Sequence, residues 1–517
     1  MMKKITEAVR NPSILLTTGG LVLLSFASRI VGLLRDRLLT SEFGVGGILD
    51  SYFSAFRIPD LIYNFLILGT LSSAFIPVFS KLLHKKDGLE DAQELVDDVF
   101  VIVAAVMGSF SVLMFIFAPS LTRIVAQSYG PDKFADTVLL TRVMAFSPLI
   151  FSLSSIVTSV LQTYKRFFAA ALAPIFYNGG IILGIVFLYP MVGVIGLGYG
   201  VVLGALFHFL VQVPALVMTG FPFRFTFGFN WSNLRRLWKL YWPRLLVIDV
   251  TTISIFIGTS IASTQADAVT IFTLAFNLNA LPLGVLAVSF ATAIFPYLSE
   301  AYAKDDEDAF RKYLAGTVSR IIFVLIPVMV LMLLFRAQLV RIVYGAGAFD
   351  WRATTLTFQT FTIFALSIPF QGLIPLFARA LYARHDTITP MVVGIGGMIL
   401  NGVLSWALIQ RFDVLGVAGA FSITIVTICL VYAGVVFRKI NHGTINGVFA
   451  YSLKVGLVSL IMGLVVQGLK MLVTWLGVND DTLIMLILIV GGIGSIGMGL
   501  YWIVSKKLGL TKVLSIN

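Results

Sequence analysis

Three arginines lie inside the first two long apolar segments of this 517-residue chain. Arg29 and Arg35 fall within ILLTTGGLVLLSFASRIVGLLRDRLL, and Arg57 falls within DSYFSAFRIPDLIYNFLIL. A charged side chain at membrane depth costs at least ~2.5–3.5 kcal/mol, and such residues mark substrate or ion pathways. Two interpretations remain open. The arginines line a water-filled cavity that accepts an anion, or they snorkel or pair with acids such as Asp36 and Asp50.

The composition identifies the protein class. Hydrophobic residues make up 58% of the chain and charged residues 12%, and the mean hydropathy is +0.97. Soluble domains carry about 25% charged residues. Apolar runs of roughly 20 residues recur along the chain, whereas a β-barrel would show alternation over about ten residues. We therefore expect an all-α polytopic membrane protein, whose first apolar segment is a retained span because no cleavage site follows it.

About fourteen transmembrane helices are expected from the apolar runs. They cover residues 14–40, 48–79, 95–118, 135–162, 168–190, 192–219, 240–263, 267–298, 313–335, 355–381, 388–410, 414–437, 449–474 and 482–504. With an even number of spans, both termini lie on one side, and the loops on that side hold most of the Lys and Arg residues. This positive-inside pattern predicts cytoplasmic termini. The exceptions are Lys133, Arg341, Arg352 and Arg411.

The net charge of +12 follows from this loop pattern. Basic cytoplasmic loops orient a membrane protein and touch anionic membrane lipids, so no nucleic acid partner is expected. Residues 223–242 mix aromatics with Arg235, Arg236 and Lys239 near the middle of the chain. Two readings remain open for this segment, an amphipathic helix in the cytoplasmic interface or a plain aromatic-belt loop.

Short matches relate the two halves of the chain. AFIPVFS at 74–80 matches AIFPYLS at 293–299, an offset of 219, and residues 159–167 match 379–387, an offset of 220. GVIGLGYG at 193–200 resembles GVAGAFSI at 416–423, an offset of 223. Three matches in chain order predict two parallel six-helix lobes around a central cavity, with two C-terminal helices outside the duplication. The expected divisions are 1–219, the interlobe linker 220–239, 240–440 and 441–517.

Over almost its whole length the chain resembles the MurJ/MviN family of lipid II flippases, within the multidrug/oligosaccharidyl-lipid/polysaccharide exporter superfamily. The most specific stretch is SRIVGLLRDRLLTSEFGVGGILDSYFSAFRIPDL at 28–61. Supporting stretches are LSSAFIPVFS at 71–80, LQTYKRFFAAALAPIFYN at 161–178, LPLGVLAVSFATAIFPYLS at 281–299, YGAGAFD at 344–350 and RALYARHDTITP at 379–390. The resemblance implies a peptidoglycan-biosynthesis transporter of the bacterial inner membrane that moves the polyprenyl-pyrophosphate-linked precursor outward.

The resemblance also implies the residues that hold the substrate. The planar guanidinium group of arginine can bind the pyrophosphate of the substrate through two hydrogen bonds. The residues that match the amino-terminal pattern are Ser28, Arg29, Arg35, Asp36 and Asp50. Arg57 occupies a position that is basic in the family. Arg29 and Arg35 are the first-choice anion ligands, and because six helical residues rotate by about 240°, both face one cavity only if it is wide or the helix bends near Gly32.

Three positions depart from the family pattern. Tyr63 and Asn277 stand where arginines are expected, and Leu68 stands where an acid is expected. Tyr63 and Asn277 can still hydrogen-bond phosphate or sugar hydroxyls, so both remain candidate substrate ligands. These departures put the exact headgroup in doubt but not the fold. A flippase for another polyprenyl-linked oligosaccharide is therefore the main alternative, ahead of a small-molecule antiporter and a scaffold for cell-wall synthesis proteins.

Gating and coupling residues are less well defined, and Asp36 of the first span is one candidate. Pro59 and Gly69 permit a bend in the second span, either as a gate or as a static kink. Arg244 and Asp249 lie in the predicted seventh span, where Asp249 could bind a coupling cation, carry a proton or neutralise Arg244. The resemblance implies coupling to membrane potential, Na⁺ or H⁺, and the sequence leaves the ion open.

Enzymatic chemistry has little support in the sequence. Gly196, Gly198 and Gly200 lie in an apolar span with no preceding strand, so helix packing explains them better than nucleotide binding. The four histidines and the single Cys429 show no metal-ligand spacing. We therefore expect a transporter that needs no cofactor rather than an enzyme.

Overall fold

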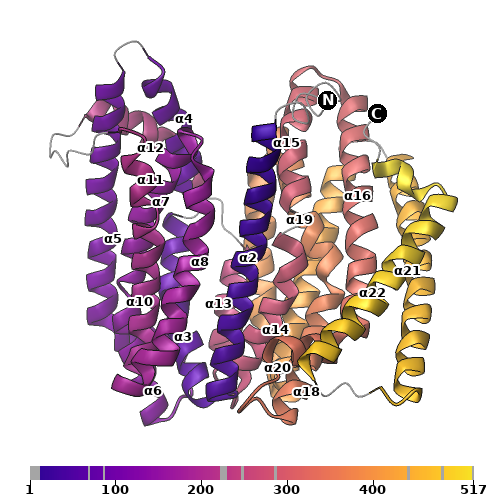
Figure 1. Cartoon of the computed structure of the whole chain (residues 1–517). Coiled ribbons are helices and arrows are strands. Elements are labelled where there is room, and N and C mark those ends of the chain that lie inside the picture. Colours follow the sequence, from indigo (N-terminus) through magenta and orange to yellow (C-terminus); the bar gives the residue numbers. More distant parts are fainter. Residues whose placement is uncertain are drawn as a thin grey trace. The chain divides into compact units, whose positions relative to one another are not determined.

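The computed structural model describes residues 12–67, 70–85, 88–221, 230–245, 250–284, 288–438, 443–478 and 482–514. Every regular element within these ranges is a helix, which confirms the expected all-α class (Figure 1). Helices occupy the described part of each predicted span. The chain divides into two compact units, Met1–Thr252 and Ile253–Asn517, and each is described by itself. The finer four-part division stays a prediction.

Unit 1 holds the first helices of the chain. They are α2 (Pro12–Phe43), α3 (Gly47–Leu66), α4 (Thr70–Leu83), α5 (Leu89–Val125), α6 (Pro131–Met144), α7 (Ser147–Thr163), α8 (Phe167–Leu183), the π-turn η1 (Gly184–Leu188), α9 (Tyr189–Val192), α10 (Ile195–Leu210), α11 (Val213–Val217) and α12 (Trp231–Leu245). Helix α2 packs on α8, and α3 packs on α6. These two contacts place the side chains of the candidate site.

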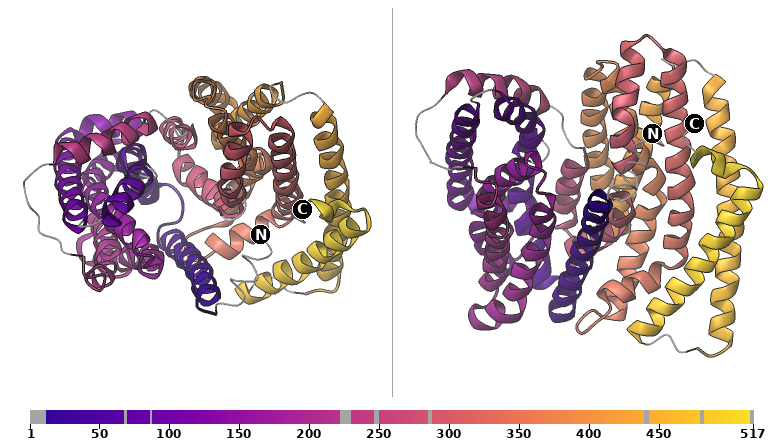
Figure 2. Two further views of the ribbon diagram at one scale, coloured as in Figure 1. Left: turned by 90° about the horizontal axis from the view of Figure 1, so that it is seen from above. Right: turned by 45° about the horizontal axis from the view of Figure 1, so that its top comes forward.

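Unit 2 holds the remaining helices. They are α13 (Val250–Ala262), which begins at the unit boundary, α14 (Ala268–Pro282), α15 (Val288–Ala303), α16 (Glu307–Leu334), α17 (Arg336–Tyr344), α18 (Trp351–Leu366), α19 (Ile368–Ala383), α20 (Ile388–Arg438), α21 (Gly443–Trp475), α22 (Leu483–Lys507) and the 3-10 turn η3 (Leu510–Leu514). Helices α21 and α22 pack on one another, and α21 also packs on α16 (Figure 2).

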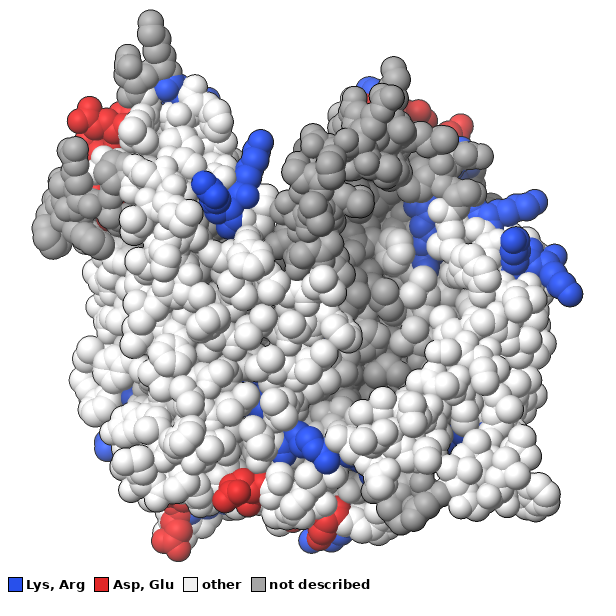
Figure 3. Space-filling view, viewed as in Figure 1, with Lys and Arg blue, Asp and Glu red and all other residues white. Residues whose placement is uncertain are grey.

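The described helices are suited to a bilayer. Eight of them are long and apolar enough to cross a membrane, and α18 with α19 forms a further candidate that is bent by 42°. Charged side chains gather toward two ends of the helices and leave a broad band with few charges between them (Figure 3). The hydrocarbon core of a bilayer requires such a band. The protein is therefore a polytopic membrane protein, as the composition predicts.

Backbone geometry repeats between the halves at an offset of 220 residues. Lys165 and His385 end equivalent helices with left-handed φ values of 58° and 60°. Gly193 and Asp413 form a second equivalent turn, with φ values of 71° and 47°. The Asp413 turn also separates the predicted spans 388–410 and 414–437 within the continuous helix α20. The structure thus bears out the internal duplication.

One of the three sequence matches is in the wrong register. A Cβ added at Gly196 would lie 2.5 Å from the carbonyl carbon of Leu188, and one at Gly416 would lie 2.5 Å from that of Leu408. The equivalent residues are thus 220 apart, not the 223 inferred from GVIGLGYG and GVAGAFSI. Close backbone packing fixes these glycines, whereas the hydrophobic residues around them match in several registers.

Glycines bring α8 and α10 into direct backbone contact. A Cβ at Gly180 would lie 2.3 Å from Gly204 Cα, and a Cβ at Gly184 would lie 2.6 Å from Gly200 Cα. Small residues at such interfaces let membrane helices approach closely without a hydrophobic driving force. The expectation that the glycine-rich segment near Gly196 serves helix packing is confirmed.

Helix α12 is amphipathic, which supports the first reading of the 223–242 segment. Leu234 and Leu237 are buried, whereas Arg235, Arg236 and Lys239 are exposed. Two contacts hold the segment on unit 1. Asn230 N donates to Asp98 Oδ2 at 2.8 Å, and Tyr241 Oη donates to Leu66 O at 2.6 Å. A helix with one apolar and one basic face is the kind that lies in a membrane interface.

Candidate anion-binding site

Arg35 is held in one orientation by three hydrogen bonds. Its Nε and Nη2 donate to Asp36 Oδ1 at 2.9 and 2.6 Å, and its Nη1 donates to Asn178 Oδ1 at 2.9 Å. Asn178 lies on α8, where its Nδ2 donates to Pro174 O at 2.9 Å. A Cβ at Gly32 would lie 3.8 Å from Asn178 Nδ2, so α2 approaches α8 closely at this point. The helix contact therefore orients the guanidinium.

Arg57 and Asp60 form the second part of the site on α3. They are three residues apart, a spacing that places both on one helix face. Asp60 interacts electrostatically with both Arg57 and Arg35, and Tyr177 of α8 interacts with Arg35. Asp60 is exposed although it lies within the apolar second segment. Arg35 and Arg57 thus both interact electrostatically with Asp60, while the hydrogen-bonded acidic partner of Arg35 is Asp36.

Asp60 and Asn178 were not predicted from the sequence. The spacing of Asp60 from Arg57 was the one available signal for it. Asn178 stands within a stretch that resembles the family, but its role depends on the packing of α2 against α8, and no local pattern encodes that contact.

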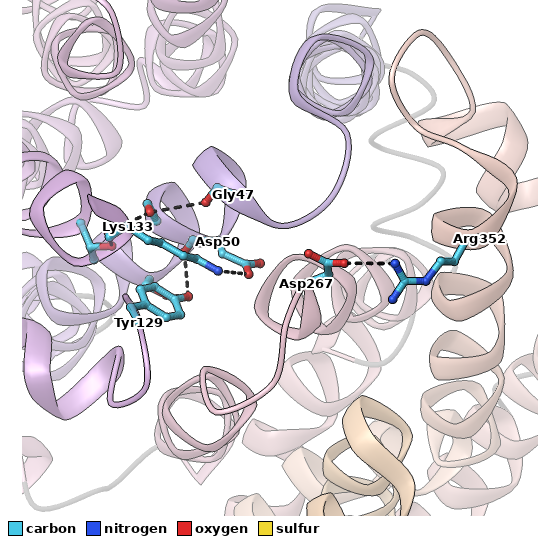
Figure 4. A network of polar contacts seen from close by, with 9 residues as sticks. Gly47, Asp50, Tyr129, Lys133, Asp267 and Arg352 are labelled. Carbon is cyan, nitrogen blue, oxygen red and sulfur yellow. Dashed lines mark hydrogen bonds and ion pairs between the residues drawn. The ribbon is translucent and has the colours of Figure 1, made fainter. Parts of the chain in front are cut away.

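Asp50 is paired inside the bundle rather than presented to an anion. Its side chain is completely buried and accepts a 2.6 Å hydrogen bond from Lys133 Nζ of α6 (Figure 4). Lys133 also lies 4.1 Å from the Tyr129 ring centroid, and the Tyr129 hydroxyl is 2.8 Å from Ser54 Oγ. Lys133 therefore departs from the positive-inside pattern because it neutralises a buried acid.

Unit 2 contains a similar ion pair. Asp267 directly precedes α14 without a side-chain capping hydrogen bond, and its Oδ2 lies 3.7 Å from Nη1 of Arg352 in the first turn of α18 (Figure 4). Helices α6 and α18 begin at Pro131 and Trp351, which are 220 residues apart. In each repeat, an ion pair near the starts of two helices thus joins them, α3 with α6 in unit 1 and α14 with α18 in unit 2. Arg352, a second exception to the loop pattern, also has an acidic partner.

The charges of the cluster balance. Arg35, Arg57 and Lys133 supply three positive charges, and Asp36, Asp50 and Asp60 supply three negative ones. Asp36 and Asp50 are buried, whereas Asp60 is exposed. An entering anion can therefore compete with Asp60 for the two arginines more readily than with the buried acids. The arrangement favours exchangeable anion binding.

Tyr63 belongs to an aromatic cluster instead of supplying the expected cation. Its ring lies 5.6 Å from that of Phe151, and its hydroxyl hydrogen-bonds Ser155. Phe151 also lies 5.0 Å from Tyr177 and 5.3 Å from His208. The residue that stands where the resemblance implies an arginine is therefore a neutral side chain within an aromatic cluster.

The other predicted residues lie in several places. Ser28 and Arg29 are partly exposed on α2, and Asn277 is half-buried on α14 in unit 2. Pro59 lies inside α3, which continues as a helix to Leu66. Arg244 belongs by its backbone to the last turn of α12. Gly69 and Asp249 lie outside the described residues.

Metal-ligating side chains do not gather at this site. Within the described ranges, no group of three or more His, Cys, Asp or Glu side chains could hold a metal ion. His208 instead lies in a polar network in which its Nδ1 is 2.7 Å from Ser154 Oγ.

Known proteins resemble this chain along most of its length. The family model described as lipid II flippase MurJ matches residues 39–487, a range that begins after Arg29 and Arg35. A probable lipid II flippase MurJ of Rhizobium tropici is 29% identical over 412 residues, covering 78% of this chain and 76% of the relative. The lipid II flippase MurJ of Burkholderia cenocepacia is 28% identical over 407 residues, with coverage of 76% and 78%.

Solved structures give the same fold. A lipid II flippase MurJ in an inward closed conformation superposes with a TM-score of 0.75 at 24% identity, covering 94% of this chain and 99% of the other. An inward-facing multidrug resistance MATE family transporter of the MOP superfamily superposes with a TM-score of 0.65 at 13% identity, with coverage of 80% and 94%. By the match of the family model over most of its length, this chain belongs to the MurJ family of lipid II flippases.

Proposed function

We propose that this protein flips lipid II, the undecaprenyl-pyrophosphate-linked peptidoglycan precursor, from the cytoplasmic to the outer leaflet by alternating access. The observation that carries the proposal is the cluster on apolar helices in which Arg35, oriented by Asp36 and Asn178, and Arg57 both interact electrostatically with Asp60. Bidentate guanidinium groups suit a pyrophosphate, and a multidrug antiporter that exports cations would favour acids instead. Membership of the flippase family supports the substrate.

The cluster suggests how the headgroup is bound and released. Asp36 and Asn178 preorganise the Arg35 guanidinium, so little side-chain entropy is lost on binding. The pyrophosphate replaces Asp60 as the partner of Arg35 and Arg57. Arg29, Ser28 and Tyr63 of the same unit add donors for phosphate or sugar, and Asn277 of unit 2 stays a predicted substrate ligand. When the headgroup leaves, Asp60 re-forms its interactions, so the empty site regains a balanced charge.

The energy source forms part of the proposal. Outward movement of an anionic headgroup works with an outside-positive membrane potential, and import of Na⁺ or H⁺ would supply further driving force. Asp249 is the candidate for that cation because an intramembrane acid needs a functional partner. Transport into liposomes with an imposed potential, Na⁺ gradient or pH gradient, compared between wild type and Asp249→Asn, identifies the ion.

One observation favours an alternative substrate to lipid II. The neutral Tyr63 stands in an aromatic cluster where the family pattern has an arginine, so the site holds one cation fewer. Another polyprenyl-linked oligosaccharide with less anionic charge would fit such a site. The localisation in the bacterial cytoplasmic membrane, with cytoplasmic termini, is the same for both substrates.

Complementation tests the function. A strain depleted of its own lipid II flippase should grow with wild type and with Arg123→Ala, which removes an exposed arginine of α5 outside the cluster. Arg35→Ala and Arg29→Ala should fail at matched membrane abundance, since each removes an anion ligand. Growth with Arg35→Ala would contradict the anion-site mechanism. Failure of well-inserted wild type would favour the other polyprenyl-linked substrate.

Asp60 provides a more specific test of the exchange step. Asp60→Asn removes the competing carboxylate, so farnesyl pyrophosphate should bind the purified protein about tenfold more tightly, as expected when ~1.4 kcal/mol of competition is lost. Complementation should weaken because release slows. The matched variant Asn64→Asp adds an acid one turn further along α3 and should weaken binding. Unchanged affinity in Asp60→Asn would remove Asp60 from the mechanism.

A further inference from the structure

A small cavity in unit 2 holds two cations that the flippase mechanism does not use. It has a volume of about 280 Å³ and lies where the end of α16 and the start of α17 meet α18 and α21. Arg336 of α17 and Lys470 of α21 both line it and interact electrostatically with one another. No acidic side chain lines the described wall of this cavity. The fold therefore holds two positively charged side chains close enough to repel one another.

Each cation makes one structural contact that leaves donors available. Lys470 Nζ donates to Leu334 O, the last carbonyl of α16, and lies 5.3 Å from the Phe335 ring centroid. The Arg336 guanidinium lies 5.7 Å from the Phe358 ring centroid. This guanidinium donates no hydrogen bond to any residue that the structure describes. An ammonium has three N–H donors and a guanidinium has five, so both groups can bind a further acceptor.

The backbone adds to the positive potential of the cavity. Arg336, Ala337 and Gln338 form the first turn of α17, a helix of nine residues, and all three line the cavity. The first turn of a helix carries N–H groups without intrahelical partners and a partial positive charge. A helix start flanked by two cations is a recurring design for binding phosphate.

A buried amide oxygen indicates what else the ligand carries. Gln338 Oε1 is inaccessible to solvent and has no hydrogen-bond partner within the described structure. A buried acceptor without a donor costs about 1–3 kcal/mol, so a ligand that supplies a hydroxyl would relieve it. A phosphate alone supplies no such donor when fully ionised. The cavity therefore fits a phosphate with a neighbouring hydroxyl group.

We propose that this cavity binds the headgroup of an anionic phospholipid such as phosphatidylglycerol. The phosphate lies between Arg336 and Lys470 at the start of α17, and a glycerol hydroxyl donates to Gln338 Oε1. The volume admits a headgroup but not acyl chains, which extend along the apolar exposed face of α21 at Leu464 and Met471. The positive-inside pattern predicts that this end of α16 faces the outer leaflet. The site lies apart from the α2–α3 cluster, and the proposal does not depend on the transported substrate.

Binding of short-chain lipids to the full-length protein in detergent tests the site. Native mass spectrometry should show dioctanoyl-phosphatidylglycerol bound at least about tenfold more tightly than dioctanoyl-phosphatidylcholine, and inorganic phosphate should bind weakly. Arg336→Gln and Lys470→Gln should each weaken phosphatidylglycerol binding by about tenfold, as the loss of a charge-assisted hydrogen bond predicts. Lys454→Gln, which removes an exposed cation from the same helix α21, should leave binding unchanged.

Further variants separate recognition of the whole headgroup from simple attraction between opposite charges. Arg336→Gln keeps the Lys470 contact with the end of α16, so it tests the site even if Lys470→Gln unfolds the protein. Gln338→Leu should weaken phosphatidylglycerol binding without affecting inorganic phosphate. Equal affinity for the two lipids, or for phosphatidylglycerol and inorganic phosphate, would overturn the proposal.

Discussion

At the scale of single residues, buried acids determine which cations are available to a substrate. Asp50 is fully buried and accepts a hydrogen bond from the ammonium of Lys133, whereas Asp60 is exposed and interacts electrostatically with Arg57 and Arg35. A buried carboxylate without a partner is expensive, so its ion pair is structural. The exposed acid can give up its partners at low cost. Burial therefore separates structural acids from exchangeable ones although both lie on α3.

The Asp50–Lys133 pair makes a testable prediction for stability. Lys133→Met should lower the free energy of unfolding by about 3–5 kcal/mol, because it leaves a buried carboxylate without a partner. The double variant Asp50→Leu/Lys133→Met should recover most of the loss, since two apolar side chains of similar size fill the same space. Thermal unfolding of the purified protein in one detergent measures both.

The second ion pair serves as the matched control. The Arg352 side chain is 73% exposed and lies 3.7 Å from Asp267, so solvent screens the interaction. Arg352→Met should change stability by less than about 1 kcal/mol. Equal losses in Lys133→Met and Arg352→Met would show that burial does not distinguish the two pairs.

At the scale of secondary-structure elements, glycines determine how closely helices pack in unit 1. Helix α8 and the π-turn η1 that follows it touch α10 through Gly180, Gly184, Gly200 and Gly204. The tight contact leaves no room for side chains and keeps α8 in position to present Asn178 to Arg35. Packing between two helices outside the candidate site thus contributes to the orientation of a candidate ligand.

Replacing a glycine by alanine should affect stability differently at a contact glycine and at a glycine with open space around it. A Cβ at Gly200 would lie 2.6 Å from Gly184 Cα, so Gly200→Ala should destabilise the protein by about 1–3 kcal/mol. Gly179 lies on α8 with nothing within 4 Å of its added Cβ, so Gly179→Ala should be neutral or stabilise by up to about 1 kcal/mol. Melting temperatures distinguish them, and a stable Gly200→Ala would mean that α8 and α10 can separate without loss.

At the scale of the whole molecule, duplication sets the order of helices and the side on which each loop lies. The turns at Lys165 and His385 share a left-handed backbone, as do those at Gly193 and Asp413. An even number of spans per repeat predicts the same orientation of both halves in the membrane. The distribution of basic residues predicts which end of each unit faces the cytoplasm.

Cysteine labelling tests this orientation. Cys429 is buried, so Cys429→Ala gives a background without reactive thiols. In intact cells, a membrane-impermeant maleimide should label Thr264→Cys, in the turn before α14, but not Lys304→Cys, in the turn after α15. Both positions are exposed, and Lys304→Cys should react once the cells are permeabilised. The reverse labelling pattern would invert the predicted topology.

The sequence by itself determined the fold class, the helix order and the duplication, because composition, apolar length and charge placement act locally. That the arginines bind an anion stays a prediction. The sequence also led to Tyr63 and Asn277 as departures from the family pattern. The structure located the repeat register, since close contacts at Gly196 and Gly416 select one alignment where hydrophobic matches allow several.

Only the tertiary structure decided which charged groups pair. Asp50 and Lys133 are 83 residues apart, and Arg35 and Asn178 are 143 apart. Such pairings depend on which helices pack and on how deeply each side chain is buried, because burial decides whether a charge needs a permanent partner. For the same reason, the cavity between Arg336 and Lys470 has no local signature. Its two cations come from helices that meet only in the folded protein.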